Sequence, residues 1–185
     1  MSKQEWPSLN DGDVFKIPLG DGRAAVGQIV SKYLTSYYMV FFDFIAAEEE
    51  VPSLVTEALE SEPLFAGLTY DGLFRPGRWQ VLENRPVDGR KYLPAYIIGG
   101  HIPSRCKVED FRGTRRRPAT DLERETLPHR KTRSSAILDD AIRADAGLEP
   151  WVEYYDALRA GDVVTSAELF DDWDPGSRGA TQEGL

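Results

Sequence analysis

Few residues of this chain could perform metal or nucleophilic chemistry: His101, His129 and its only cysteine, Cys106. A zinc site needs three or four converging ligands, usually marked by closely paired Cys or His residues. Pro103 separates His101 from Cys106, so these two do not form a helical ligand pair. A Cys–His nucleophile pair is open in principle, because such partners meet in space rather than in sequence. A half-buried structural cysteine and surface histidines explain the pattern more simply, so we expect no catalytic residue, metal or cofactor.

Other catalytic signatures are missing from the sequence. Gly20, Gly22 and Gly27 have the wrong spacing for a phosphate-binding loop, and strand-like sequence follows them. No G-x-S-x-G or H-E-x-x-H motif is present. Neighbouring carboxylates such as Glu48 and Glu49 diverge on a helix or strand, which does not suit an acid–base pair. The residues therefore predict a protein that is not an enzyme.

The charge is distributed unevenly. The chain has 22 basic and 31 acidic residues and a net charge of −9, which disfavours general affinity for nucleic acid or anionic membranes. Residues 1–65 carry −7, residues 66–135 carry +7 and residues 136–185 carry −9. A basic middle between acidic ends could reflect separate patches for separate partners, or attraction within the fold. Ordinary surface pairing of opposite charges is the simpler interpretation.

The basic middle contains an arginine cluster, Arg115–Arg117, with Arg112, Arg130, Lys131 and Arg133 nearby. Guanidinium groups bind phosphate well, but they bind carboxylates equally well. Because two acidic segments are present in the same chain, we expect most of these arginines to pair internally. A small-barrel interaction module that binds nucleic acid or a peptide is the alternative.

The length of 185 residues predicts one compact domain with appendages. We expect an N-terminal arm over residues 1–10, a single domain over 11–160 and an acidic C-terminal tail over 161–185, mobile toward its end. The longest apolar run, Tyr37–Phe42, is too short to span a membrane, and the first ten residues lack the pattern of a signal peptide. We therefore expect a cytoplasmic protein.

Strand patterns dominate the first half of the chain. Residues 12–18 and 24–30 flank a Gly-Asp-Gly turn, which predicts an antiparallel hairpin, and the aromatic run 37–44 predicts a third, central strand. A helical stripe follows within residues 45–61, where Pro52 suits a first helical turn.

The second half is mixed. Residues 78–82 and 92–98 predict two further strands, residues 106–111 a short one, and residues 112–118 an irregular segment. Ser134 or Ser135 can cap a helix ending near Gly147, and the apolar positions Trp151, Tyr154, Tyr155 and Leu158 predict a second helix from Pro150 to Gly161. The fold class expected is α+β, a curled antiparallel sheet or small open barrel with a C-terminal helical hairpin.

One stretch of sequence points to a family. Residues 12–28 read GDVFKIPLGDGRAAVGQ, with a G-D-hydrophobic-F strand, an I-P-L exit, a D-G-R turn and a returning strand that contains a glycine. Phe42-Asp43, then Arg78–Val81 and Leu93–Tyr96, follow in the expected order. Together they resemble the immunity protein 26 family of bacterial polymorphic toxin systems, over about residues 11–120. None of these motifs is catalytic.

The resemblance implies a protein that binds and neutralises a cognate toxin without catalysis. The net charge of −9 agrees with a basic toxin such as a nuclease, and with no nucleic acid or membrane partner. An acidic protein associates faster with a basic partner. The acidic segments that could dock are Glu48, Glu49 and Glu50, and Glu168, Phe170, Asp171, Asp172, Trp173 and Asp174. Phe170 and Trp173 would be the anchors. The alternative is a tail helix whose Leu169, Phe170 and Trp173 pack on the core.

Overall fold

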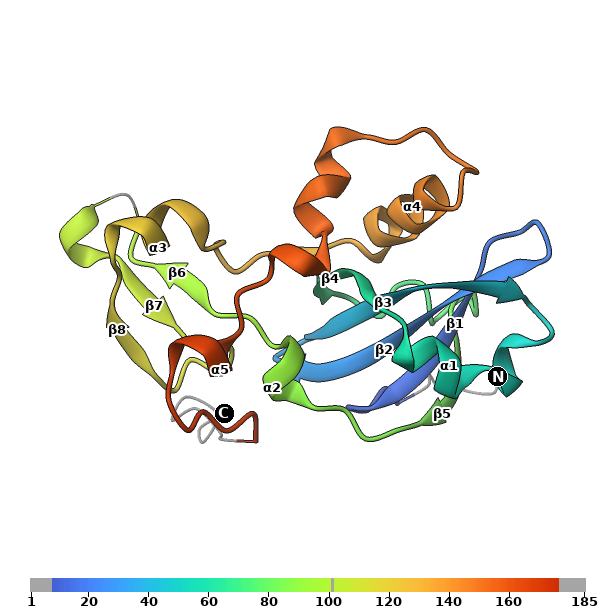
Figure 1. Cartoon of the computed structure of the whole chain (residues 1–185), viewed down its shortest axis with the longest axis horizontal. Coiled ribbons are helices and arrows are strands. Elements are labelled where there is room, and N and C mark those ends of the chain that lie inside the picture. Colours follow the sequence, from blue (N-terminus) through green and yellow to red (C-terminus); the bar gives the residue numbers. More distant parts are fainter. Residues whose placement is uncertain (1–7, 101, 177–185) are drawn as a thin grey trace, which may run out of the picture. The chain divides into compact units, whose positions relative to one another are not determined.

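The computed structural model describes residues 8–100 and 102–176 of the chain. These residues form two compact units built from interleaved segments (Figure 1). Unit 1 contains residues 8–87 and Thr132–Asp162, and unit 2 contains residues 88–100, 102–131 and 163–176. The residues predicted as one domain, 11–160, are thus shared between two units, and the single domain stays a prediction. The end of the expected mobile tail, residues 177–185, lies outside the described residues.

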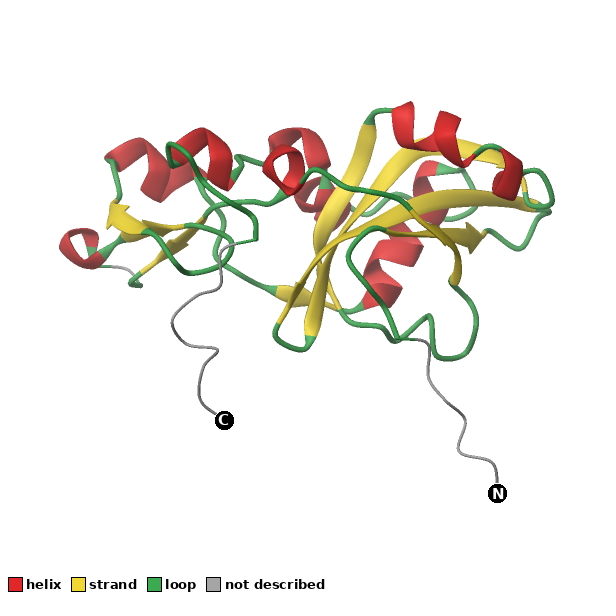
Figure 2. Cartoon of the chain, turned by 90° about the horizontal axis from the view of Figure 1, so that it is seen from below, coloured by secondary structure: helices red, strands yellow, loops and turns green. Residues whose placement is uncertain are grey.

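Unit 1 is built on a six-stranded mixed sheet of order β5-β1-β2-β3-β4-β9. The predicted antiparallel meander is confirmed, with Phe15 opposite Gly27 and Gly27 opposite Phe41. The sheet is twisted and open (Figure 2), and only β9 pairs in parallel, with β4. Its strands are β1 (Asp13–Pro18), β2 (Arg23–Tyr33), β3 (Ser36–Ala47), β4 (Pro63–Thr69), β5 (Gln80–Asn84) and β9 (Thr132–Arg133). The predicted α+β class is confirmed.

Glycines fix the first hairpin. Gly20 and Gly22 have φ values of 86° and 88°, which side-chain-bearing residues rarely adopt, so the predicted turn forms between β1 and β2. Gly27 is needed for a different reason. A Cβ atom there would lie 2.5 Å from the Phe15 ring, so only glycine lets that ring cross the neighbouring strand.

One face of the sheet holds an aromatic core. The rings of Phe15 and Trp79 are stacked 5.3 Å apart, and Phe41 and Phe74 meet Trp79 edge to face. The predicted helix α4 (Ser135–Asp145) covers this face with Leu138, Ala141 and Ile142. Trp79 donates its indole N–H to Asp139 of α4 at 2.9 Å, which satisfies a buried polar group. The opposite face is contacted by η1 (Val51–Ser53) and α1 (Val55–Glu60), which confirms the predicted helical stripe.

Unit 2 contains a three-stranded antiparallel sheet of order β6-β7-β8 with short helices around it. The predicted strand within 106–111 is confirmed as β7, but residues 112–118, predicted to be irregular, include β8. β8 forms because β7 offers it a pairing edge and a buried carboxylate, Glu109, for Arg116. The elements are α2 (Gly89–Tyr92), β6 (Tyr96–Ile98), η2 (Pro103–Arg105), β7 (Lys107–Glu109), β8 (Arg116–Pro118), α3 (Asp121–Thr126) and α5 (Ser166–Leu169).

The expected helical hairpin is only half observed. α4 begins after Ser134, whose hydroxyl accepts from the Ala136 N–H at 3.2 Å, and Gly147 follows its end with φ 79°. The second predicted α-helix is instead two short 3-10 turns, η3 (Glu153–Leu158) and η4 (Ala160–Asp162). Arg159 forms an isolated antiparallel bridge with Phe65 of β4, and this extended pairing is incompatible with a continuous helix.

Candidate partner-binding surfaces

The C-terminal acidic segment, residues 168–174, starts in a helix cap. The Glu168 carboxylate accepts from the Thr165 N–H at 2.6 Å, and the Thr165 hydroxyl accepts from the Glu168 N–H. This reciprocal capping box starts α5. Glu168 therefore has a structural role, and its carboxylate is less available to a partner than the sequence suggests.

Phe170 and Trp173, the predicted anchors, point into unit 2. Trp173 is fully buried and donates its indole N–H to Asp110 at 2.7 Å, while Phe170 is 8% exposed and lies beneath the Arg117 guanidinium group. This placement agrees with the alternative in which the segment packs on the core. Their role as partner anchors stays a prediction, which would require the segment to open.

The remaining acidic side chains of this segment face solvent. Asp171, Asp172 and Asp174 are exposed, and Asp172 has a φ of 51°, so the backbone turns sharply between the two buried aromatic residues. The alternation of aromatic and acidic residues in the sequence thus corresponds to rings that are buried and carboxylates that face solvent. Asp172 tolerates this conformation because short polar side chains are the least strained there.

Arginines hold the backbone of the same segment. Arg112 donates to the Pro175 carbonyl at 2.8 Å, and Arg115 donates to the carbonyls of Asp171 and Asp172. Arg90 donates to the Trp173 carbonyl. Arg90 and Arg115 therefore order the acidic segment through its carbonyl groups and not through the exposed carboxylates of Asp171 and Asp172.

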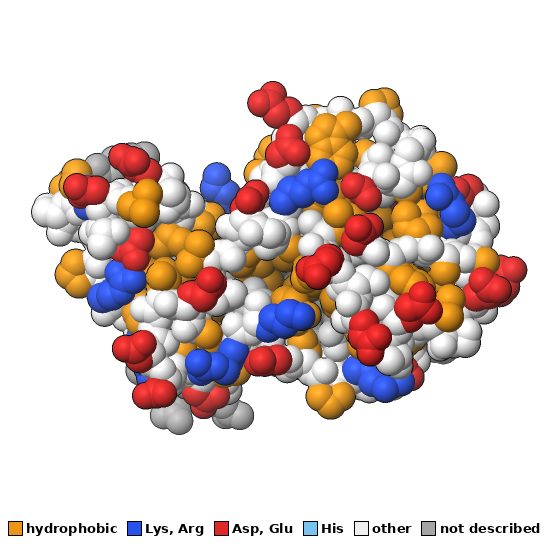
Figure 3. Space-filling view, in the orientation of Figure 1, with side chains coloured by type: hydrophobic (Ala, Val, Ile, Leu, Met, Phe, Trp, Pro, Cys, Tyr) orange, Lys and Arg blue, Asp and Glu red, His pale blue; other side chains and the backbone are white. Residues whose placement is uncertain are grey.

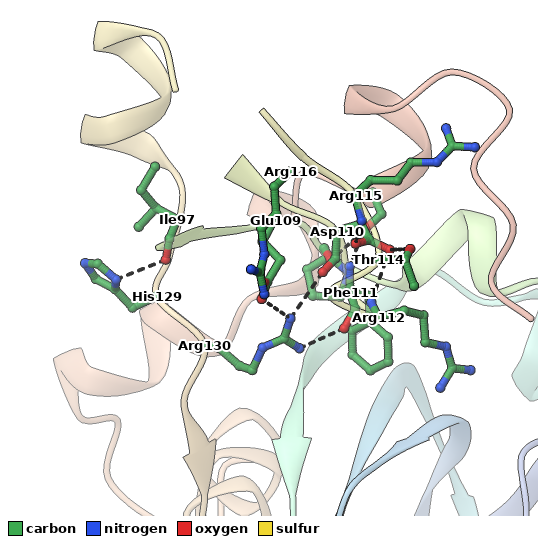
Figure 4. Close-up of polar contacts among 12 residues, drawn as sticks. Ile97, Glu109, Asp110, Phe111, Arg112, Thr114, Arg115, Arg116, His129 and Arg130 are labelled. Carbon is green, nitrogen blue, oxygen red and sulfur yellow. Dashed lines mark hydrogen bonds and ion pairs between the residues drawn. The ribbon is translucent and has the colours of Figure 1, made fainter. Parts of the chain in front are cut away.

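Asp110 accepts several of the hydrogen bonds drawn in Figure 4. Its carboxylate is completely buried and accepts from the Arg115 N–H at 2.7 Å, the Thr114 hydroxyl at 2.9 Å and the Trp173 indole. Burying a carboxylate is costly unless several donors replace water, and here they do. The contacts tie the loop after β7 to the C-terminal segment, which indicates a structural role.

Arg116, Arg117 and Arg130 pair with carboxylates, as predicted for most of the cluster, but their partners Glu109 and Glu123 belong to the basic middle rather than to the two acidic segments. Arg130 donates to Glu109 at 3.1 Å and to the Phe111 carbonyl at 2.9 Å (Figure 4), and Arg116 bonds the second oxygen of Glu109 at 2.7 Å. Arg117 binds Glu123 through two nitrogens, and this hydrogen bonding lowers the Glu123 pKa to about 2. Guanidinium groups engaged in this way form a poor phosphate patch.

The second acidic segment belongs to unit 1. Glu48, Glu49 and Glu50 follow β3; Glu48 forms an ion pair with Lys16 at 3.0 Å, and Glu49 and Glu50 are exposed. The two predicted acidic segments thus lie in different units. As partner-binding residues they remain predictions.

The candidates for chemistry are engaged in local structure. Cys106 is buried and its thiol donates to the Gly100 carbonyl at 3.1 Å, while Nδ1 of His129 lies 3.2 Å from the Ile97 carbonyl oxygen. His101 lies outside the described residues. Within residues 8–100 and 102–176, no three His, Cys, Asp or Glu side chains converge as a metal site. Among the same residues, no helix combines the length and apolarity needed to cross a membrane.

Residues 148–156 form an exposed surface that the sequence reasoning missed. Trp151 is 39% and Tyr154 48% exposed, although both were assigned to the buried stripe of a predicted helix. The sequence did contain a signal for this exposure, namely Pro150 and the acidic residues Glu149 and Glu153. A helix that packs on a core rarely carries so much charge beside its aromatic residues.

Comparison with protein families gives a match between residues 10–99 and the family model described as Immunity protein 26. This region of the chain is similar to immunity protein 26. This region contains β1 to β6 and every motif on which the resemblance was based, so the predicted family is confirmed there. The match ends at Gly99, short of the expected residue 120, and covers just under half of the chain. Comparison with curated proteins and with solved structures gives no match.

Proposed function

We propose that this protein binds a cognate bacterial toxin and neutralises it by electrostatic and shape complementarity, without making or breaking a bond itself. The match of residues 10–99 to immunity protein 26 carries the proposal, because it indicates an immunity protein whose partner is a toxin. A non-catalytic role is consistent with that family.

The acidic surface supports a basic toxin as the partner. Asp171 and Asp172 in unit 2, and Glu49 and Glu50 in unit 1, are exposed carboxylates in a chain of net charge −9. Nucleases that cut nucleic acid bind phosphate with basic clefts, so a basic nuclease is the toxin class proposed. Electrostatic attraction between the acidic protein and a basic toxin would raise their association rate and favour this toxin over uncharged proteins.

Fixed geometry supports shape complementarity. Buried Trp173 and two arginines, Arg90 and Arg115, that bind carbonyl groups hold the 168–174 backbone in one conformation. A surface ordered before binding loses less conformational entropy when a partner docks. The buried rings therefore hold the carboxylates of Asp171 and Asp172 outward, where they contribute to the field that attracts a basic toxin.

Co-expression with the product of the neighbouring gene, as the candidate toxin, tests the proposal. We expect cell survival and co-purification of the two proteins, and an association rate that falls as salt is added because exposed charges are screened. A toxin that kills equally well with and without this protein, and does not co-purify at low salt, would refute it. Mixing the protein with labelled RNA or DNA should give no salt-sensitive complex.

A further inference from the structure

The strongest unexplained feature lies in unit 1, in the segment that we call the Trp151 patch, residues 148–156. Four large hydrophobic side chains of this segment are exposed by 39–49%: Leu148, Trp151, Val152 and Tyr154. Within the described part of the chain, the other exposed large hydrophobic side chains are spread over separate segments. Isolated exposed apolar residues are normal, whereas a contiguous group marks an interaction site.

The exposed rings are held rigidly. Trp151 stacks on the buried Phe65 ring with centroids 6.2 Å apart, and the Arg159 guanidinium group lies 4.7 Å from the Trp151 centroid. The Tyr155 ring meets Trp151 edge to face at 5.5 Å. These contacts fix the indole while leaving part of it open to solvent. A fixed, half-exposed aromatic side chain can bind a partner with little loss of rotamer entropy.

Tyr154 is fixed in a similar way. Its hydroxyl accepts a hydrogen bond from Nε of Arg133 at 3.1 Å, and its side chain remains 48% exposed. Trp, Tyr and Arg are the residue types that contribute most often to binding hot spots. Trp151 and Tyr154 therefore provide two anchors on one short segment.

The charge of the patch indicates its partner. Glu149, Glu153 and Asp156 are exposed on the same segment, whereas Arg159 pairs with Asp145 at 3.7 Å. Figure 3 shows acidic side chains among hydrophobic ones on the face in view. Apolar anchors surrounded by carboxylates fit a protein surface that has hydrophobic pockets with a basic rim.

The patch also lies outside residues 10–99, the region that matches the immunity protein family. A framework common to a family can bind different partners when the contacting segment lies beyond the common part. We infer that the Trp151 patch is the surface with which this protein docks onto its toxin, with Trp151 and Tyr154 entering apolar pockets of a basic partner. This inference rests on the proposed function and adds the docking site.

The test measures affinity for the purified, catalytically inactive toxin of the neighbouring gene. Trp151→Ala and Tyr154→Ala should each weaken binding about 30-fold, the effect of losing a hot-spot side chain. Tyr70→Ala is the matched control, since Tyr70 in the same unit is 47% exposed and lies outside the patch, and it should change affinity by less than about 3-fold.

A charge reversal provides a second test that does not disturb the rings. Glu149→Lys with Glu153→Lys should slow association about 10-fold at low salt, because both carboxylates are exposed. Glu57→Lys with Glu60→Lys makes the same change of charge on the exposed side of α1 and should have a much smaller effect.

The outcomes separate this inference from the proposed function. Wild-type protein that neither binds nor protects would overturn both. Wild-type protein that binds while the patch variants bind equally well would overturn only the docking site. Sedimentation velocity tests whether a second copy of the protein covers the patch instead. The inference fails if the wild-type protein is a dimer, Trp151→Ala dissociates this dimer, and the toxin affinity of the variant is unchanged. The patch would then serve self-association.

Discussion

Two tryptophans near the C-terminus of the chain have similar neighbours in sequence and opposite positions in the structure. Trp151 lies between Glu149 and Glu153 and is 39% exposed, whereas Trp173 lies between Asp172 and Asp174 and is fully buried. The difference lies in their distant partners. Trp173 donates its indole N–H to the buried carboxylate of Asp110, while Trp151 stacks on Phe65 and stays partly exposed.

This comparison shows that acidic neighbours do not reveal whether an aromatic residue belongs to a core or to an interface. A buried indole needs a hydrogen-bond acceptor, and that acceptor can be remote in sequence. Trp79 of unit 1 follows the same rule with Asp139. Each unit thus buries one tryptophan against one aspartate, and Trp151 differs from both.

The largest expected difference between the two residues is in stability. Trp173→Ala should lower the free energy of unfolding by about 3–5 kcal/mol, because it empties a buried site and leaves Asp110 without one donor. Trp151→Ala, which removes a partly exposed stacking contact, should cost about 1 kcal/mol. Calorimetric unfolding of both variants measures this, and equal costs would contradict the division into core and surface.

Replacing the acceptor should have the next largest effect. Asp110→Asn keeps the shape of the side chain but replaces one carboxylate oxygen by an NH2 group, which cannot accept a hydrogen bond. Either the Arg115 N–H, which donates to Oδ1, or the Trp173 indole and the Thr114 hydroxyl, which donate to Oδ2, then lose their acceptor. We expect a loss of about 2 kcal/mol in urea unfolding at neutral pH. The control is Asp171→Asn on the exposed side of the same segment; a comparable loss there would show that burial of Asp110 is not the cause.

The pH dependence of stability sharpens the account of the arginine cluster. The Arg117 hydrogen bonds lower the Glu123 pKa from the usual 4.5 to about 2 in the folded protein. Stabilisation from this group is therefore complete above pH 4.5 and disappears as the pH falls toward 2. Since the pair is partly exposed, Glu123→Gln should cost only about 0.5–1 kcal/mol at pH 7.

The difference between wild type and Glu123→Gln should shrink steadily between pH 4.5 and pH 2 in thermal unfolding. Glutamine can still cap α3, so the capping box contributes little to this difference. A carboxyl titration by NMR that places the Glu123 pKa at its usual value would contradict the ion-pair geometry.

The smallest stability effect is expected at the outward carboxylates. Asp171→Asn with Asp172→Asn should change stability by less than about 0.5 kcal/mol, and Asn tolerates the left-handed conformation at position 172. Toxin association at low salt should nevertheless become slower if these carboxylates contribute to the proposed attraction. Glu57→Gln with Glu60→Gln is the control with an equal change of charge; equal slowing by both pairs would indicate net charge alone.

Local signals in the sequence predicted the first meander well. The Gly20 and Gly22 turn, the β-branched runs and the aromatic β3 all act between neighbouring segments, so the pattern and the structure agree. The cap at Ser134 and the end at Gly147 were predictable for the same reason.

The failures involve distant contacts. β8 could not be expected from Arg115–Arg117, because it depends on β7 and on the two arginines that share Glu109. The prediction of a second helix in the hairpin was wrong. The extended pairing of Arg159 with Phe65 prevails over the helical preference that the spacing of the apolar residues indicates. The burial of Phe170 and Trp173 was open in the sequence, since one pattern suits both packing and binding.

The interleaved chain path has a practical consequence for the immunity protein 26 region. Residues 10–99 retain the strands β1 to β5, yet they lack α4, whose Leu138, Ala141 and Ile142 cover the aromatic core. A fragment cut at Gly99 would lose the helix that packs on the core of Phe15 and Trp79, together with the aspartate that accepts from the indole. The residues that match the family model therefore depend on a later segment of the chain to complete their core.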